Sequence, residues 1–134
     1  MTYRMFCVMT LVALAMACGS DSSSPTSPSG GGGGNTQPPV ATTTITITAA
    51  GVSPQRITVS PGSRVTFVNN DSRTHEMNSD PHPTHGDCPG IDDVGFLSAG
   101  QSKQTGNLTV ARTCSYHDHN QPTVSSLQGQ IIVQ

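Results

Sequence analysis

Metal-binding side chains gather in one stretch of this 134-residue chain. They are His75, His82, His85, Cys88, Cys114, His117 and His119. All five histidines of the sequence lie within 45 residues, although charged residues make up only 10% of the chain. Imidazole nitrogen and thiolate sulfur are ligands of copper and zinc. The clustering therefore predicts a metal site and is hard to attribute to solubility.

Cys114 begins the segment CSYHDHN, three residues before His117 and five before His119. One hypothesis makes its thiolate a copper ligand, since one thiolate and two imidazoles suit both Cu(I) and Cu(II). The alternative is a disulfide with Cys88, which would close a loop of about 25 residues and stabilise the fold by ~3 kcal/mol. In that case only histidines remain as ligands. The sequence leaves both hypotheses open.

A second segment, DPHPTHGDC, places His82 and His85 three residues apart on a loop stiffened by prolines. These two side chains could form a second metal position, or they could replace one of the other histidines as ligands. The alternative is a solvated loop whose histidines have no role.

The N-terminal region predicts export. Arg4 precedes the apolar run Met5 to Ala17, which is too short to cross a membrane but suits a secretory signal. Its end, LAMAC, resembles the lipobox of bacterial lipoproteins, in which the cysteine, here Cys18, is lipidated. We therefore expect a signal peptide at 1–17 and a lipidated Cys18 with a flexible Ser/Gly/Pro tether at 18–40. The domain would then lie on the periplasmic side of a bacterial membrane or at the cell surface.

Residues 41–134 predict one all-β domain, a Greek-key sandwich of six to eight short strands. Period-two alternation or β-branched runs mark strands at 42–49, 55–59, 63–69, 75–78, 94–97, 104–116 and 129–134. Pro and Gly separate them, and we find no convincing helix. The long segment after Asn70, with three prolines and little apolar periodicity, is predicted to be mostly loop.

The segment PQRITVSPGSRVTFVNNDSRTHEM resembles the first half of a cupredoxin of the plastocyanin type. In that family a histidine eight residues after the Phe is the first copper ligand, and Phe67 to His75 keeps this interval. The second half also matches, with a strand ending in Cys, a histidine three residues later, and a last strand of the form G-x-[IV]-x-V from Gly129.

The resemblance implies a single copper ion, bound by His75, Cys114 and one loop histidine. His117 has the plastocyanin spacing from Cys114, and His119 has the spacing of azurin. The axial methionine of the family is replaced by Leu127, with Gln121 as an alternative axial ligand. These departures leave the axial side of the ion and its reduction potential open.

These observations predict a membrane-tethered copper protein that transfers electrons between redox partner proteins. One alternative is a copper-binding or copper-handling protein with a His-rich site and a Cys88–Cys114 disulfide. Another is a metal-free structural sandwich that binds other proteins. We see no set of nucleophile and base that would indicate an enzyme, and no basic patch for nucleic acid. We expect a monomer attached to the membrane only through its N-terminal lipid.

Overall fold

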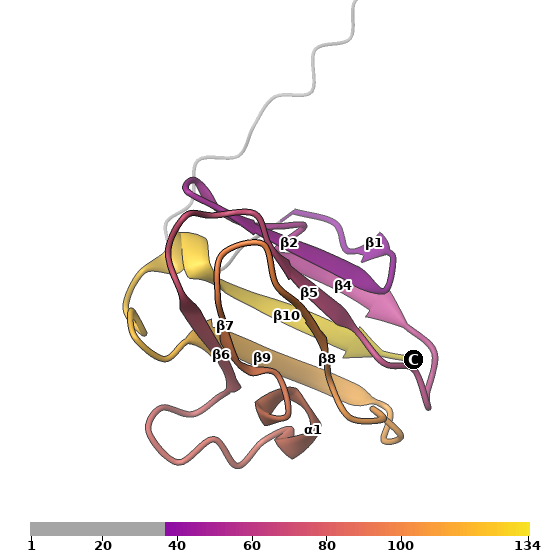
Figure 1. Cartoon of the computed structure of the whole chain (residues 1–134). Coiled ribbons are helices and arrows are strands. Elements are labelled where there is room, and N and C mark those ends of the chain that lie inside the picture. The colour runs from indigo at the N-terminus through magenta and orange to yellow at the C-terminus, as the bar shows by residue number, and fades with distance from the viewer. Residues whose placement is uncertain (1–36) are drawn as a thin grey trace, which may run out of the picture. The chain divides into compact units, whose positions relative to one another are not determined.

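Two β-sheets pack face to face in the computed structural model, which describes residues 37–134 (Figure 1). The larger sheet contains, in spatial order, β1 (Val40–Ala41), β4 (Arg56–Val59), β10 (Gln128–Val133), β9 (Arg112–Asp118), β6 (His75–Ser79) and β7 (Gly95–Leu97). The smaller sheet contains β3 (Gly51–Ser53), β2 (Thr44–Thr48), β5 (Thr66–Asn69) and β8 (Ser102–Gln104). Both sheets mix parallel and antiparallel neighbours.

The core lies between the sheets and is built by period-two alternation. Ile45 and Ile47 of β2 are fully buried, while the threonines that alternate with them are half-buried or exposed. Across the sandwich, Phe67 of β5 meets Tyr116 of β9 edge to face, with ring centroids 5.2 Å apart. Aromatic pairs in this geometry stabilise a core beyond their buried area.

The all-β sandwich predicted from the sequence is confirmed. The described residues form ten strands instead of six to eight, because β1, β3 and β8 are only two or three residues long and leave little periodicity to detect. Two short helices were also missed, α1 (Pro89–Asp92) and the 3-10 turn η1 (Ser125–Leu127). Cys18 and the predicted signal peptide lie outside the described residues. Within residues 37–134, no helix has the length and apolar character needed to cross a membrane.

The course of β9 matters most for the site. The sequence predicted a strand over 104–116, but β9 begins at Arg112 and continues to Asp118. Cys114 pairs with Ile131 of β10 in the middle of the ladder, and Asp118 pairs with Met77 of β6. In Figure 1, β9 (orange) lies between β10 (yellow) and β6. His117 is therefore a strand residue and not part of a loop.

Close approach of β9 to β10 requires a glycine at position 129. A β-carbon there would meet the carbonyl oxygen of Gln55 and the phenol of Tyr116. We predict that Gly129→Ala lowers the free energy of unfolding by about 1–3 kcal/mol, because backbone must move to admit the methyl group. Urea denaturation measures the change. Gly86→Ala is the control, since a β-carbon added there would have no other atom within 4 Å, and equal losses in both variants would contradict the steric argument.

Candidate metal centre

Cys114 is bonded to Cys88, with Cα atoms 5.7 Å apart. This is the disulfide alternative left open by the sequence. A sulfur in a disulfide is not a thiolate, so the predicted His75, Cys114 and loop-histidine site is not assembled in this structure. The physical reason is the extension of β9, which places Cys114 within the ladder and beside the segment that leads into α1.

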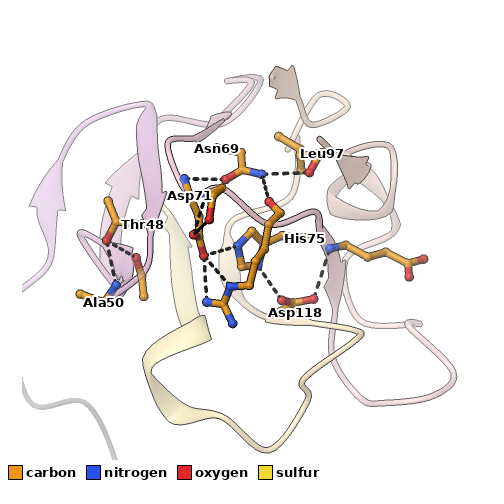
Figure 2. A network of polar contacts seen from close by, with 11 residues as sticks. Thr48, Ala50, Asn69, Asp71, His75, Leu97 and Asp118 are labelled. Atoms are coloured by element: carbon orange, nitrogen blue, oxygen red, sulfur yellow. Dashed lines mark hydrogen bonds and ion pairs between the residues drawn. The ribbon is translucent and has the colours of Figure 1, made fainter. Parts of the chain in front are cut away.

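His75 also takes a different role from the predicted one. Its ring is fully buried and held between two carboxylates, with Nδ1 2.8 Å from Asp118 Oδ2 and Nε2 3.1 Å from Asp71 Oδ2 (Figure 2). Both ring nitrogens are occupied, so neither is directed at a shared metal position. The groups beside His75 are thus two carboxylates and not a thiolate.

Further hydrogen bonds hold this buried network. Asp118 Oδ1 accepts from the backbone N–H groups of Glu76, at 3.2 Å, and of Asn120, at 3.0 Å. On the other side, the Arg73 guanidinium donates to Asp71, and this hydrogen bond is the main reason why the pKa of Asp71 is lowered to about 2. Desolvation opposes the shift, while hydrogen bonds from His75 and the Ser72 backbone add to it. Charge therefore persists inside the domain because it is paired.

Asn69 fixes the turn that leads to His75. Its side-chain amide donates to the carbonyl oxygens of Arg73 and Leu97, and its Oδ1 accepts from Asp71 N at 2.9 Å (Figure 2). Asn69 therefore orders the segment before His75.

The other four histidines come together. One ligand nitrogen from each of His82, His85, His117 and His119 can be chosen so that all four lie within 4.8 Å of one another. The ring centroids of His82 and His119 are 4.7 Å apart, and those of His85 and His119 are 4.8 Å apart. These residues form what we call the four-histidine cluster. Two of them come from the end of β9 and two from the proline-containing loop. His82 and His85 therefore lie close enough to His117 and His119 to act as the substitute ligands that the sequence suggested.

The loop from Asp80 to Cys88 is tied to β9 and to itself. Asp80 N donates to Ser115 O at 3.0 Å, and Asp87 N closes the loop by donating to Asp80 O at 3.0 Å. His85 N donates to Pro81 O at 2.8 Å, and its own carbonyl accepts from Ser79 Oγ at 3.0 Å. His85 has a φ of 48°, an uncommon conformation for a residue other than glycine. These bonds hold the ring of His85 over β9.

His117 has one ring nitrogen paired with a carboxylate and one that is buried without a protein partner. Its Nδ1 lies 2.6 Å from Asp80 Oδ1, which fixes the proton on Nδ1 when the imidazole is neutral. Its Nε2 is buried, and among the described residues no donor or acceptor reaches it. A buried imidazole nitrogen without a partner is unfavourable in a metal-free domain. A carboxylate on the far nitrogen is the usual support of a metal-bound histidine.

Electrostatics keep the most exposed member of the cluster neutral. Much of His82 is exposed, but its pKa is lowered by partial desolvation and then by the nearby charges of His119, His117 and His85 when these are protonated. A lowered pKa favours the neutral imidazole, which is the form that coordinates metals. His82 is therefore biased toward the metal-binding form.

The remaining predicted site residues do not surround a common position. Leu127 is a buried core residue on η1, and Gln121 is half-buried in the turn after β9, where its backbone N–H donates to Asp118 O. Without a thiolate site there is no axial position for either to fill. Asp80 was missed by sequence reasoning, although a carboxylate directly before PHPTH was a usable signal.

Comparison with solved structures shows a cupredoxin-like fold. A purple cupredoxin from Nitrosopumilus maritimus matches with a TM-score of 0.54 and 20% identity, over 69% of this chain and all of that one. Plastocyanin from Dryopteris crassirhizoma gives 0.53 and 17%, over 68% of this chain and 99% of the other. A mutant amicyanin in its Cu(I) form gives 0.51 and 19%, over 68% and 80%. No protein-family model and no curated protein matches the sequence.

The contribution of the buried network to stability can be tested by lowering the pH. Because the folded pKa of Asp71, about 2, lies below its ordinary value of 3.8, its contribution to stability is complete above pH ~4 and is lost as pH falls through 2. We predict that Asp71→Asn lowers the free energy of unfolding at neutral pH and that the difference from the wild type narrows between pH 4 and 2. Urea unfolding at each pH measures it. Asp87→Asn, an exposed carboxylate with the same charge change, should show no such narrowing.

Proposed function

We propose that this chain, whose fold is cupredoxin-like, is a copper-binding protein that holds one copper ion in the four-histidine cluster. Its role would be to capture and hand over copper. Rapid electron transfer would need Cys114 as a thiolate ligand. Its sulfur is bonded to Cys88, so it is not part of the site. The proposal is the copper-handling alternative with a Cys88–Cys114 disulfide that the sequence left open.

The unpartnered Nε2 of His117 carries the proposal. Its burial costs free energy unless something accepts its lone pair, and the nitrogens of three other histidines lie within 4.8 Å. Nitrogen ligands at about 2.0 Å from one ion are separated by up to about 4 Å. The ring nitrogens would need to move inward by less than about one ångström to reach that arrangement. The donor set thus fits a single ion.

Ligand chemistry favours copper. Four neutral imidazoles can bind Cu(II) or zinc, but Cu(II) binds nitrogen ligands most tightly in the divalent first-row series. The similar amicyanin structure is described as holding Cu(I). In this chain the equivalent of the first ligand, His75, is engaged by Asp71 and Asp118. We therefore place the ion with the histidines of β9 and the Asp80–Cys88 loop, rather than beside His75.

The chain's own residues would do three things. Asp80 orients His117 through its Nδ1 and raises the basicity of the ring. The hydrogen-bonded loop holds His85 in position before any metal arrives, which reduces the entropy lost on binding. His82, the most exposed of the four, leaves one side of the cluster open to solvent for exchange with a donor or acceptor of copper. In this proposal the protein sets the positions and the protonation states of the four imidazoles before copper binds.

The setting of this activity is also a proposal. The export signal, the lipidated Cys18 and the tether predicted from the sequence would hold a monomeric domain on the periplasmic side of a bacterial membrane or at the cell surface. A disulfide fits such an oxidising compartment. Redox partner proteins belong to the electron-transfer hypothesis, which lacks its thiolate here. The partner in this proposal is a molecule that gives or receives copper.

Copper titration tests the proposal. We predict that the purified full chain binds one equivalent of Cu(II) and shows no intense thiolate-to-copper absorption in the visible range. His117→Ala and His119→Ala should each weaken binding at least tenfold, because each removes one of four nitrogens. Competition with a chelator of known affinity measures the effect. An intense visible band that disappears in Cys114→Ala would restore the His/Cys/His site and sink this proposal.

Asp80 gives a second test at one remove from the metal. We predict that Asp80→Asn weakens Cu(II) binding about 10–100-fold, because His117 loses the carboxylate that orients it. The control is Asp87→Asn, which makes the same charge change in the same loop at an exposed side chain. Equal weakening in the two variants would indicate a general charge effect and remove Asp80 from the supporting role.

A further inference from the structure

We propose that the Cys88–Cys114 disulfide controls the copper affinity of the four-histidine cluster, so that its reduction by a dithiol releases the metal. This inference rests on the proposed copper site and names its regulation. The disulfide lies outside the cluster, and nothing in the proposed coordination uses either sulfur. Its influence comes from the two segments that it joins.

The cysteines stand at matched distances from the ligands. His85 lies three residues before Cys88 and His117 lies three residues after Cys114, in the patterns H-x-x-C and C-x-x-H. On the same two segments, His82 lies six residues before Cys88 and His119 lies five residues after Cys114. The disulfide therefore joins the segment that carries one ligand pair to the strand that carries the other. Without the bond, only hydrogen bonds and packing hold the loop against β9.

Chain statistics give the size of the effect. The β6–β9 ladder attaches the loop at one end, where Ser79 lies opposite Tyr116, and the disulfide attaches the other end, nine residues later at Cys88. The probability that a flexible segment of nine residues returns its free end to β9 falls roughly as the −3/2 power of its length, about 30-fold, and the packing of α1 on β6 offsets part of this loss. An oxidised chain should thus bind copper about tenfold more tightly than a chain without the bond. A loop that is further loosened would increase the ratio.

A surface pocket gives reagents a route to the bond. Both cysteines line a cavity of about 160 Å³ together with Pro89, Val110 and Arg112. Val110 is 64% exposed, and the two cysteines are otherwise buried. Arg112 and Asp87 both line this pocket, so a residue of each charge borders the approach to the bond. None of the four clustered histidines lines it, so attack there needs no contact with them.

The exchange is balanced between the two partners. A thiolate of the dithiol attacks one sulfur of the Cys88–Cys114 bond, forming a mixed disulfide and releasing the other cysteine. The second thiol of the reagent then resolves the mixed disulfide. Two electrons and two protons pass from the dithiol to this chain, which ends with two thiols, and the reagent leaves as its own disulfide. The natural reductant in this proposal is a protein dithiol of the envelope.

The first experiment compares Cu(II) affinity in the oxidised full chain and in the Cys88→Ala/Cys114→Ala variant, by chelator competition. We expect a loss of about tenfold or more in the variant. The control is Ile45→Ala, which removes core methyl groups from β2 in the other sheet and lowers stability without touching the disulfide. Equal affinities of oxidised chain and double variant would overturn the inference. So would an equal loss in Ile45→Ala, because the bond would then act only through general stability.

A second measurement does not depend on the double variant folding. The metal-free wild-type chain is treated with dithiothreitol under native conditions, and hydrogen exchange is followed by mass spectrometry. We expect two maleimide-reactive thiols in addition to those of the untreated chain, at Cys88 and Cys114, and faster exchange in residues 80–88, with β2 and β5 unchanged. Failure of the thiols to appear before global unfolding, or unchanged exchange in the loop, would overturn the inference. An oxidised chain that binds no copper would instead overturn the proposed function, with the exchange result still able to stand.

Discussion

The pairing of β9 with β10 and β6 is the constraint on which the rest of the site depends. Successive side chains of a strand point to opposite faces, so the register decides which residues enter the core. Tyr116 and Asp118 are fully buried, and Tyr116 meets Phe67 of the opposite sheet. His117, between them in sequence, lies on the other face, toward the Asp80–Cys88 loop. A slip of one residue would exchange these roles.

Burying the Asp118 carboxylate inside the sandwich costs free energy, and the hydrogen bond with His75 offsets part of that cost. A buried carboxylate is tolerated only when it is paired, and here it accepts from one imidazole and two backbone N–H groups. Asp71 and Arg73 complete the chain of partners toward the surface. The surroundings of His75 are therefore filled by a polar network with its own packing and charge balance. His117, a member of the four-histidine cluster, lies on the other face of β9.

That face offers a different kind of site from the one that the family resemblance implied. Ligands supplied by two strands and held by packing would favour rapid electron transfer with little rearrangement. Two of the four clustered histidines come from a loop that is fixed by a few hydrogen bonds and one disulfide. Such a loop can open locally at lower free-energy cost than a strand in the core. The copper site that we propose would therefore suit binding and release, with an affinity that depends on how the loop is attached.

The sequence by itself determined the sandwich, most of its strands and the set of residues that can bind metal. Alternation in TITIT and RITV and the turns at Pro and Gly act locally, so they can be read without a structure. All four clustered histidines were among the predicted candidates. Tertiary structure decided which candidates meet. Whether β9 ends at Tyr116 or continues to Asp118 depends on ladders with β10 and β6, which are distant in sequence. The disulfide, the burial of His75 and the partnership of Asp80 with His117 all follow from that pairing, because contacts across 26 to 43 residues leave no local pattern.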